Sequence, residues 1–435
     1  MPLTQPTTPA GRAHVPVGPR RSDRHLDARM VTVRSEADII GAVMRAHAEG
    51  RRVRAVGSGG SKNRNYATTG TQLDMAGYGR LIDVDRNRVT VEAGMPCSGL
   101  FALLRAHGLA ITTPGEWNEA TVGGAVSTGT HGGSARHGCL AASLCRIRLV
   151  CADGSVRTLE RGSDAFSHAG VSLGLLGIVS RLTFECTGRF HLALERTLHS
   201  FDEVVAAEMW ADQAVEYWSG VWFPAARRVL AYAANRCAPP RTCNRRALRY
   251  GTMTAVLSIL SENAGRIAFV APRLLQQTAR GESHDMLSPI GFTPRRVRFC
   301  QRLSAGAREV EFAVPLERSA AILTEFDAFL RTWPGRLNLP VGLRATAGDA
   351  FSLSPCYGRD VLWIATFFRD EPRFAEALAG FFAGFDARCH WGKHLGLSRE
   401  HLRTQYARWP AFTTMRRSLD PDNIFVNHFT EELGL

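Results

Sequence analysis

Three short glycine-rich segments in the first half of the chain constrain its fold more than any other feature. Residues 56–61 read Val-Gly-Ser-Gly-Gly-Ser after a predicted strand, and residues 172–179 place Gly174 and Gly177 at the start of another. Residues 121–133 hold five glycines and four serines or threonines, which no ordinary core element would. Glycines let backbone N–H groups approach an anion closely and form a nest around it. The three segments together predict a large phosphate-bearing ligand.

The standard nucleotide motifs are missing from these segments. No Gly-Lys-Ser/Thr follows residues 56–61, which excludes a Walker A loop. The same segment does not open a helix with Gly-x-Gly-x-x-Gly, which argues against a nicotinamide Rossmann site.

The composition is that of a globular protein, with 45% hydrophobic and 21% charged residues in a chain of 435. The net charge of +13 comes from arginine, because only Lys62 and Lys393 are lysines among the 53 basic residues. The arginines are scattered without a basic and aromatic module, so we expect no nucleic-acid partner. No apolar run approaches the ~20 residues that span a bilayer, so we expect no membrane span.

The ten cysteines form no Cys-x-x-Cys motif, and Cys237 and Cys243 have no common zinc spacing. We therefore expect no metal. No apolar core follows Arg20 and Arg21, so nothing predicts a secretory signal. Reduced thiols and a cytoplasmic location are expected.

The chain divides into four predicted parts. Residues 1–29 are rich in Pro, Thr and Arg without periodicity, which predicts a flexible tail. Residues 30–188 form a first α+β domain, residues 189–388 a second, and residues 389–435 a closing segment. Predicted strands are 51–56, 81–84, 89–92, 146–151, 156–159, 178–185, 216–223, 310–314 and 361–368. Predicted helices are 39–44, 100–107, 206–215, 320–330 and 371–385. Ser35 and Asp38 form a capping-box pattern before the first helix, Asp153 and Gly154 predict a hairpin turn, and residues 236–246 predict a basic loop.

Motifs in the second half complete a pattern. Residues 354–360 read Ser-Pro-Cys-Tyr-Gly-Arg-Asp, residues 390–393 read His-Trp-Gly-Lys, and residues 419–421 read Leu-Asp-Pro. With the glycine-rich segments, they resemble the FAD-binding vanillyl-alcohol oxidase (PCMH-type) superfamily, and within it the aldonolactone and alditol oxidases. The resemblance implies an α+β fold of two domains. A PCMH-type FAD-binding domain is joined by a cap (substrate-binding) domain, whose antiparallel sheet is flanked by helices.

The resemblance implies FAD, with its pyrophosphate on residues 56–61. Many members link the flavin to a histidine in this segment, but Gly60 aligns there, which implies non-covalent FAD. Cys139 does not occupy the position of a flavin-linking cysteine, and we interpret it as a small buried thiol. The residues implied to bind FAD are Val56, Gly57, Ser58, Gly59, Gly60, Ser61, Gly115, Thr121, Gly124, Ser127, Thr128, Gly129, His131, Gly177, Ile178, Val179 and Lys393.

Four residues are predicted to be catalytic. Lys393 would stabilise negative charge that develops during hydride transfer. Arg344 would clamp an anionic group, and His390 would hydrogen-bond the flavin or act as a base. Glu116 would act as a base or hydrogen-bond partner in place of a missing glutamate. Each could instead have no catalytic role. Lys393 could be a solvated surface lysine, Arg344 part of a structural ion pair, His390 a structural hydrogen-bonding residue, and Glu116 a carboxylate of an exposed loop.

The predicted pocket departs from that of the alditol oxidases. Their Glu-x-Arg pair is represented here by Gly342 and Arg344, and two further polar positions align with Ala365 and Phe367. Leaving a buried hydroxyl unpaired costs about 1–3 kcal/mol. The pocket therefore predicts a larger substrate, anionic or partly apolar, rather than a bare alditol.

The resulting hypothesis is an FAD-dependent oxidoreductase of biosynthesis. It would remove hydride from a C–OH or C–N carbon of a modified sugar or sugar-like metabolite and deliver it to flavin N5. Gly115 would leave room for O2 beside the flavin, which favours an oxidase over a dehydrogenase. Two alternatives stay open: an aldonolactone oxidase or dehydrogenase of ascorbate-like synthesis, and a flavin-binding protein without turnover.

Overall fold

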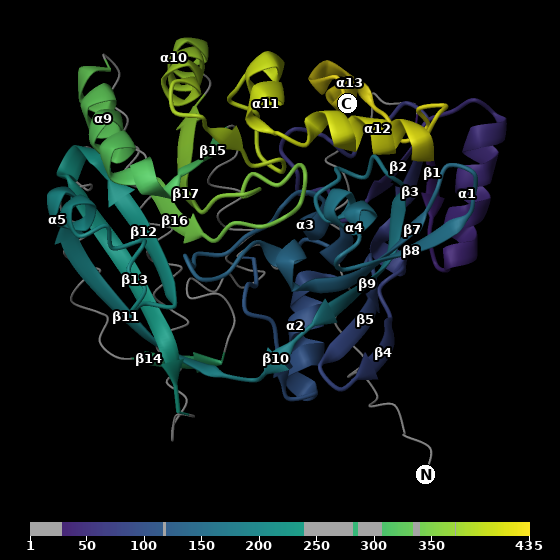
Figure 1. The fold of residues 1–435 in the computed structure, drawn as a ribbon, viewed down its shortest axis with the longest axis horizontal. Coiled ribbons are helices and arrows are strands. Elements are labelled where there is room, and N and C mark those ends of the chain that lie inside the picture. The colour runs from purple at the N-terminus through teal and green to yellow at the C-terminus, as the bar shows by residue number, and fades with distance from the viewer. Residues whose placement is uncertain (1–27, 116–118, 239–281, 286–306, 334–339, 370) are drawn as a thin grey trace.

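The computed structural model describes residues 28–115, 119–238, 282–285, 307–333, 340–369 and 371–435. Figure 1 shows two sheet-containing halves side by side, with the yellow C-terminal segment running along the top from the middle of the view to above the N-terminal half. Residues 1–27 of the predicted tail lie outside the described residues, and the first strand begins at Arg29. Among the described helices, none is long and apolar enough to cross a membrane.

The N-terminal half contains two main sheets among its described residues. A parallel sheet has the order β1-β3-β2, and an antiparallel sheet has the order β4-β5-β9-β7-β8. The strands are β1 (Arg29–Thr32), β2 (Val53–Val56), β3 (Thr71–Asp74), β4 (Leu81–Asp85), β5 (Arg88–Glu92), β6 (Leu109–Ala110), β7 (Leu144–Val150), β8 (Val156–Glu160), β9 (Ile178–Glu185) and β10 (Thr187–Gly188). The helices are α1 (Glu36–Ala48), α2 (Cys97–Ala106), α3 (Val122–Ser127) and α4 (Asp164–Ala169).

The second half is built on one large antiparallel sheet. Its order among the described strands is β14-β11-β13-β12-β16-β17-β15-β18. The strands are β11 (His191–Ser200), β12 (Tyr217–Phe223), β13 (Arg228–Cys237), β14 (Glu282–Asp285), β15 (Ala307–Pro315), β16 (Val341–Thr346), β17 (Val361–Arg369) and β18 (Arg388–Cys389). The helices are α5 (Phe201–Ala206), α9 (Ser319–Thr332), α10 (Pro372–Ala383), α11 (Arg399–Gln405), α12 (Trp409–Leu419) and α13 (His428–Leu433).

The two faces of the large sheet have different chemistry, because side chains alternate along each strand. On one face, the ring of Phe312 stacks on that of Phe382 of α10, with centroids 4.0 Å apart. The ring of Trp222 packs edge-on against Phe326 of α9, with centroids 5.9 Å apart. The opposite face turns towards the N-terminal half, where His131 Nε2 lies 3.5 Å from the Glu311 carboxylate. Polar residues of β15 and β16 therefore lie between the two halves.

The C-terminal segment returns to the N-terminal half. Val53 N–H donates to the Ile424 carbonyl at 2.7 Å, which places the segment beside β2. The Asn427 side-chain amide donates to the Asn65 carbonyl at 2.9 Å. The C-terminal segment therefore supports the segment that follows β2.

Most predicted elements are present. α1 begins with the expected capping box of Ser35 and Asp38, and the predicted turn at residues 153–154 joins β7 to β8. The predicted helix over residues 206–215 is wrong. α5 ends at Ala206, and Glu208 has a left-handed backbone with a φ of 42°, which a helix cannot continue. Of the predicted loop at 236–246, the first two residues continue β13 and the last eight lie outside the described residues.

Candidate active site

The first and second glycine-rich segments pack directly against each other. β2 ends at Val56, and an added Cβ on Gly57 would overlap the Thr121 side chain. Thr121 caps α3 by accepting a hydrogen bond from Gly124 N–H at 3.3 Å. Only glycine at position 57 allows this approach, so the two backbone segments form one continuous surface.

The third segment and the His-Trp-Gly-Lys motif join the same place. Leu173 N–H donates to the Ser127 carbonyl at 3.1 Å, which ties the third segment to the second. Lys62 N–H donates to the Gly392 carbonyl at 2.9 Å, which ties the first segment to the motif. Four segments far apart in sequence therefore meet between the two halves of the molecule.

The structure gathers the predicted cofactor residues along these segments, while their roles stay a prediction. Gly60 and Gly124 are exposed. The buried members are Val56, Gly115, Thr121, Gly129, His131, Gly177, Ile178 and Val179, and the half-buried members are Gly57, Ser58, Gly59, Ser61, Ser127, Thr128 and Lys393.

A buried charged cluster lies beside the four segments. Glu311 of β15 forms an ion pair with Arg344 of β16. His131, from the second segment, places Nε2 at 3.5 Å from Glu311 Oε1. The His131 ring stacks on Trp363 of β17 with centroids 3.9 Å apart, and its centroid lies 5.4 Å from that of His390. Three strands, one glycine-rich segment and the C-terminal motif thus contribute to one cluster.

The cluster has a defined charge distribution. Burial alone would raise the pKa of Glu311, but the positive charge of Arg344 and the interaction with His131 outweigh it and hold that pKa well below its ordinary value. Burial lowers the pKa of His390 to about 3 against the opposing pull of Glu311. Near neutral pH, Glu311 is therefore an anion and His390 is uncharged.

Hydrogen bonds to the backbone decide which imidazole nitrogens carry protons. His131 Nδ1 lies 2.9 Å from the Gly132 carbonyl, which can only accept, so this nitrogen carries a hydrogen. His390 Nδ1 accepts from Gly392 N–H at 2.9 Å, so the hydrogen of neutral His390 is on Nε2. His390 is therefore a hydrogen-bond donor at the site rather than a base.

Lys393 also has an acidic partner. Its ammonium group forms an ion pair with Glu309, two residues before Glu311 on the same face of β15. Both partners are partly buried, with side chains 22% and 18% exposed. Lys393 and Arg344 are thus both paired with glutamates, and the catalytic role of Lys393 stays a prediction.

Glu311 was missed by sequence reasoning, and it corrects the predicted loss of an acid. Glu311 lies directly opposite Ala365 of β17, which lies directly opposite Gly342 of β16. The acid expected at position 342 is absent, but Glu311 reaches Arg344 from two strands away. A signal was present in the sequence, because Glu309 and Glu311 alternate with Val310 and Phe312 in a predicted strand.

Two other predictions about the site change or fall outside it. An added Cβ on Gly115 would overlap the methyl group of Thr130, so the space expected to be open for O2 is filled by that side chain. Glu116 lies outside the described residues.

Three residues of the cluster lie close enough together to be considered as metal ligands. One ligand atom each of His131, Glu311 and His390 lie within 4.8 Å of one another. A cation here would have to displace Arg344 from Glu311. It would also need the unprotonated nitrogen of His390, which already accepts from Gly392. The local charges and protons thus fit an ion-pair network better than a metal centre.

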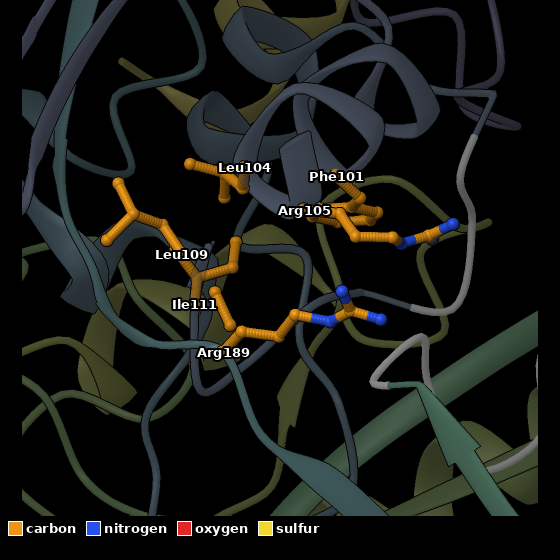
Figure 2. A pocket seen from close by; sticks show the side chains of 7 residues that line it. Phe101, Leu104, Arg105, Leu109, Ile111 and Arg189 are labelled. Atoms are coloured by element: carbon orange, nitrogen blue, oxygen red, sulfur yellow. The ribbon is translucent and has the colours of Figure 1, made fainter. Parts of the chain in front are cut away.

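A small cavity lies elsewhere in the N-terminal half, between α2 and the strands β6 and β10 (Figure 2). Apolar side chains line most of it, with Arg105 and Arg189 on one side. None of its lining residues belongs to the four converging segments, so it is separate from the cluster.

Comparisons with known proteins identify the family. Residues 28–160 match a family described as an FAD binding domain, and residues 182–433 match the family described as D-arabinono-1,4-lactone oxidase. The chain belongs to the D-arabinono-1,4-lactone oxidase family. It therefore is an FAD-dependent oxidoreductase that acts on CH–OH groups, as the sequence predicted.

Three relatives illustrate the range of the family. L-gulono-1,4-lactone dehydrogenase of Mycobacterium tuberculosis is 31% identical, and the match covers 92% of this chain and 94% of the relative. L-gulonolactone oxidase of Mus musculus is 29% identical over 89% of this chain and 91% of its own. Alditol oxidase of a Streptomyces species is 31% identical over 81% of this chain and 82% of its own.

The fold is that of a known flavoprotein class. Cholesterol oxidase from Brevibacterium sterolicum superposes with a TM-score of 0.74 over 93% of this chain and 94% of its own, at 13% identity. This likeness supports the two-domain PCMH-type fold alone.

The residues present fit FAD. Gly57 lets the first glycine-rich segment pack against Thr121 of the second, and the converging segments offer backbone N–H and hydroxyl groups with little bulk. The glycine-rich segments would hold the cofactor, and bound FAD would supply the acceptor for two electrons.

Proposed function

We propose that the protein oxidises a C–OH group of a modified, sugar-like metabolite, with O2 as the electron acceptor. The observation that carries this proposal is the Glu311, Arg344, His131 and His390 cluster, which adjoins the segments that would hold FAD. These groups can orient a hydroxyl, because Arg344 and His390 donate hydrogen bonds and Glu311 accepts them. Ala365 is small and Phe367 half-buried and apolar, which supports a partly apolar substrate.

The oxidation of a sugar lactone is the second candidate. Two relatives carry L-gulonolactone in their names, and the matched family is described by another aldonolactone. Relatives named as oxidases support O2 as the acceptor, whereas the Mycobacterium tuberculosis relative is named a dehydrogenase.

FAD is proposed to be bound without a covalent link. Gly60 has no side chain that could attack the flavin. The buried Cys139 thiol donates to Asp349 at 3.3 Å, and its pKa is raised well above the ordinary value, mainly by burial. A thiol of this kind is a poor nucleophile. The eight described cysteines are all free, which supports a reducing, cytoplasmic location.

One series of spectra tests these proposals. Flavin released entirely into the supernatant after acid precipitation is the expected result for non-covalent FAD. Anaerobic mixing with a panel of L-gulono-1,4-lactone, alditols and modified sugars should bleach the flavin with at least one member. Admitting air to the bleached enzyme should restore the colour within seconds if O2 is the acceptor. A protein that no panel member bleaches, although dithionite does, would contradict the proposed activity.

A further inference from the structure

We propose that Glu311 determines the charge of the substrate by neutralising Arg344, so that its removal opens the site to anionic sugars. This inference rests on the proposed function, because it concerns the substrate of the same site. It assigns a specificity role to a residue that lies on a different strand from its arginine.

The sheet register explains how Glu311 reaches Arg344. Gly342, Ala365 and Glu311 form one row across β16, β17 and β15, and their side chains share a face. Arg344 follows Gly342 by two residues and therefore lies on this face as well. Because positions 342 and 365 carry little or no side chain, nothing bulky separates the carboxylate from the guanidinium. A larger residue at either position would block this path.

The pair is enclosed rather than solvated. The Glu311 side chain is 1% exposed and that of Arg344 is 14% exposed. The His131 ring stacks on Trp363, and its Nε2 lies 3.5 Å from the same Glu311 carboxylate. Such a buried pair is weakly screened by water, so its charges act strongly on any group that enters.

A second ion pair neutralises Lys393 in the same way. Lys393 pairs with Glu309, and the neutral His390 adds no charge. A substrate carboxylate or phosphate would have to displace a glutamate from its cation and lie beside that glutamate. An uncharged hydroxyl or lactone oxygen meets no such penalty. Under this inference, Arg344 would not clamp an anionic substrate in the wild type.

Glu311→Gln is the direct test, because glutamine keeps the shape of the side chain and removes its charge. The probes are L-gulono-1,4-lactone and L-gulonate, which share a carbon skeleton and differ in charge. Their dissociation constants are measured from the change in flavin absorbance in the FAD-loaded protein without oxygen, a readout of binding rather than turnover. In Glu311→Gln, we expect L-gulonate to bind at least tenfold more tightly than it does to the wild type, and the lactone to change by less than threefold.

Two variants act as controls. Glu36→Gln removes another glutamate that pairs with an arginine, Arg148, at α1 on the far side of the molecule (Figure 1). It should leave both constants unchanged. Glu311→Gln combined with Arg344→Met removes both charges and should abolish the gain in L-gulonate affinity. If Glu311→Gln does not retain FAD, Glu311→Asp withdraws the carboxylate from Arg344 and should give about a threefold gain in its place.

The outcomes separate this inference from the proposed function. Unchanged or undetectable L-gulonate binding in the folded, FAD-loaded variant overturns the role of Glu311, and so does a wild type that binds L-gulonate as tightly as the lactone. Failure of every panel member to bleach the flavin overturns the proposed function. The binding measurement is unaffected by that failure.

Discussion

At the scale of single residues, His390 has a protonation behaviour that can be measured directly. Its folded pKa is about 3, mainly because burial disfavours the charged form, whereas an unfolded histidine has a pKa of about 6.5. The unfolded chain therefore binds one proton more between these values. The stability due to neutral His390 is complete above pH 6.5 and is lost as the pH falls towards 3, by ~1.4 kcal/mol per pH unit.

Replacement of His390 by asparagine should remove this dependence. Asparagine can still accept the hydrogen bond from Gly392 N–H, which His390 accepts at 2.9 Å. We expect the variant to lose less stability than the wild type between pH 6.5 and 4.5 in denaturant unfolding of the FAD-saturated protein. His428→Asn, at a side chain that is 87% exposed, should follow the wild type. Parallel pH curves for wild type and His390→Asn would contradict a buried neutral histidine.

At the scale of elements, the contact between the first glycine-rich segment and α3 predicts a strict requirement for glycine. An added Cβ on Gly57 would overlap Thr121, so Gly57→Ala should separate the two segments that would hold FAD. Overpacking of this kind costs about 1–3 kcal/mol. We therefore expect the dissociation constant for FAD to rise by about tenfold, measured from the quenching of flavin fluorescence.

Gly41→Ala provides the matched control within α1. A Cβ on Gly41 would meet nothing within 4 Å, so the same substitution should stabilise the helix by about 0.5–1 kcal/mol and leave FAD binding unchanged. Equal FAD affinities of Gly57→Ala and wild type would show that the two segments need not touch to hold the cofactor.

The elements also explain which parts of the site could be predicted. The glycine-rich segments and the capping box of Ser35 are local signals, so the sequence predicts them and the structure contains them. The pairing of Glu311 with Arg344 depends on the register of β15, β17 and β16, which no local pattern specifies. Glu311 within an apolar strand indicated a buried acid, but only the order and register of the strands show that its partner is Arg344.

At the scale of the whole molecule, Arg54 connects parts of the chain that lie far apart in sequence. Its buried guanidinium donates to the carbonyls of Asn65 at 2.6 Å, Leu173 at 2.7 Å and Phe425 at 2.7 Å. Asn65 follows the first glycine-rich segment, Leu173 belongs to the third, and Phe425 belongs to the C-terminal segment. One side chain therefore connects β2, the residues that follow the first glycine-rich segment, the third glycine-rich segment and the C-terminal segment.

Arg54→Met should consequently damage both stability and cofactor binding. The variant leaves several buried carbonyls without a donor, each at a cost of about 1–3 kcal/mol, so we expect a loss of at least about 3 kcal/mol. The neighbouring Arg52 provides the control, because its side chain is 39% exposed and pairs only at the surface with Glu431. Arg52→Met should cost about 0–1 kcal/mol. Denaturant midpoints and the FAD content after gel filtration measure the two effects together. If Arg54→Met unfolded at the midpoint of Arg52→Met and kept its FAD, the C-terminal segment would have to be held without Arg54, by its backbone bond to β2 and the Asn427 side chain.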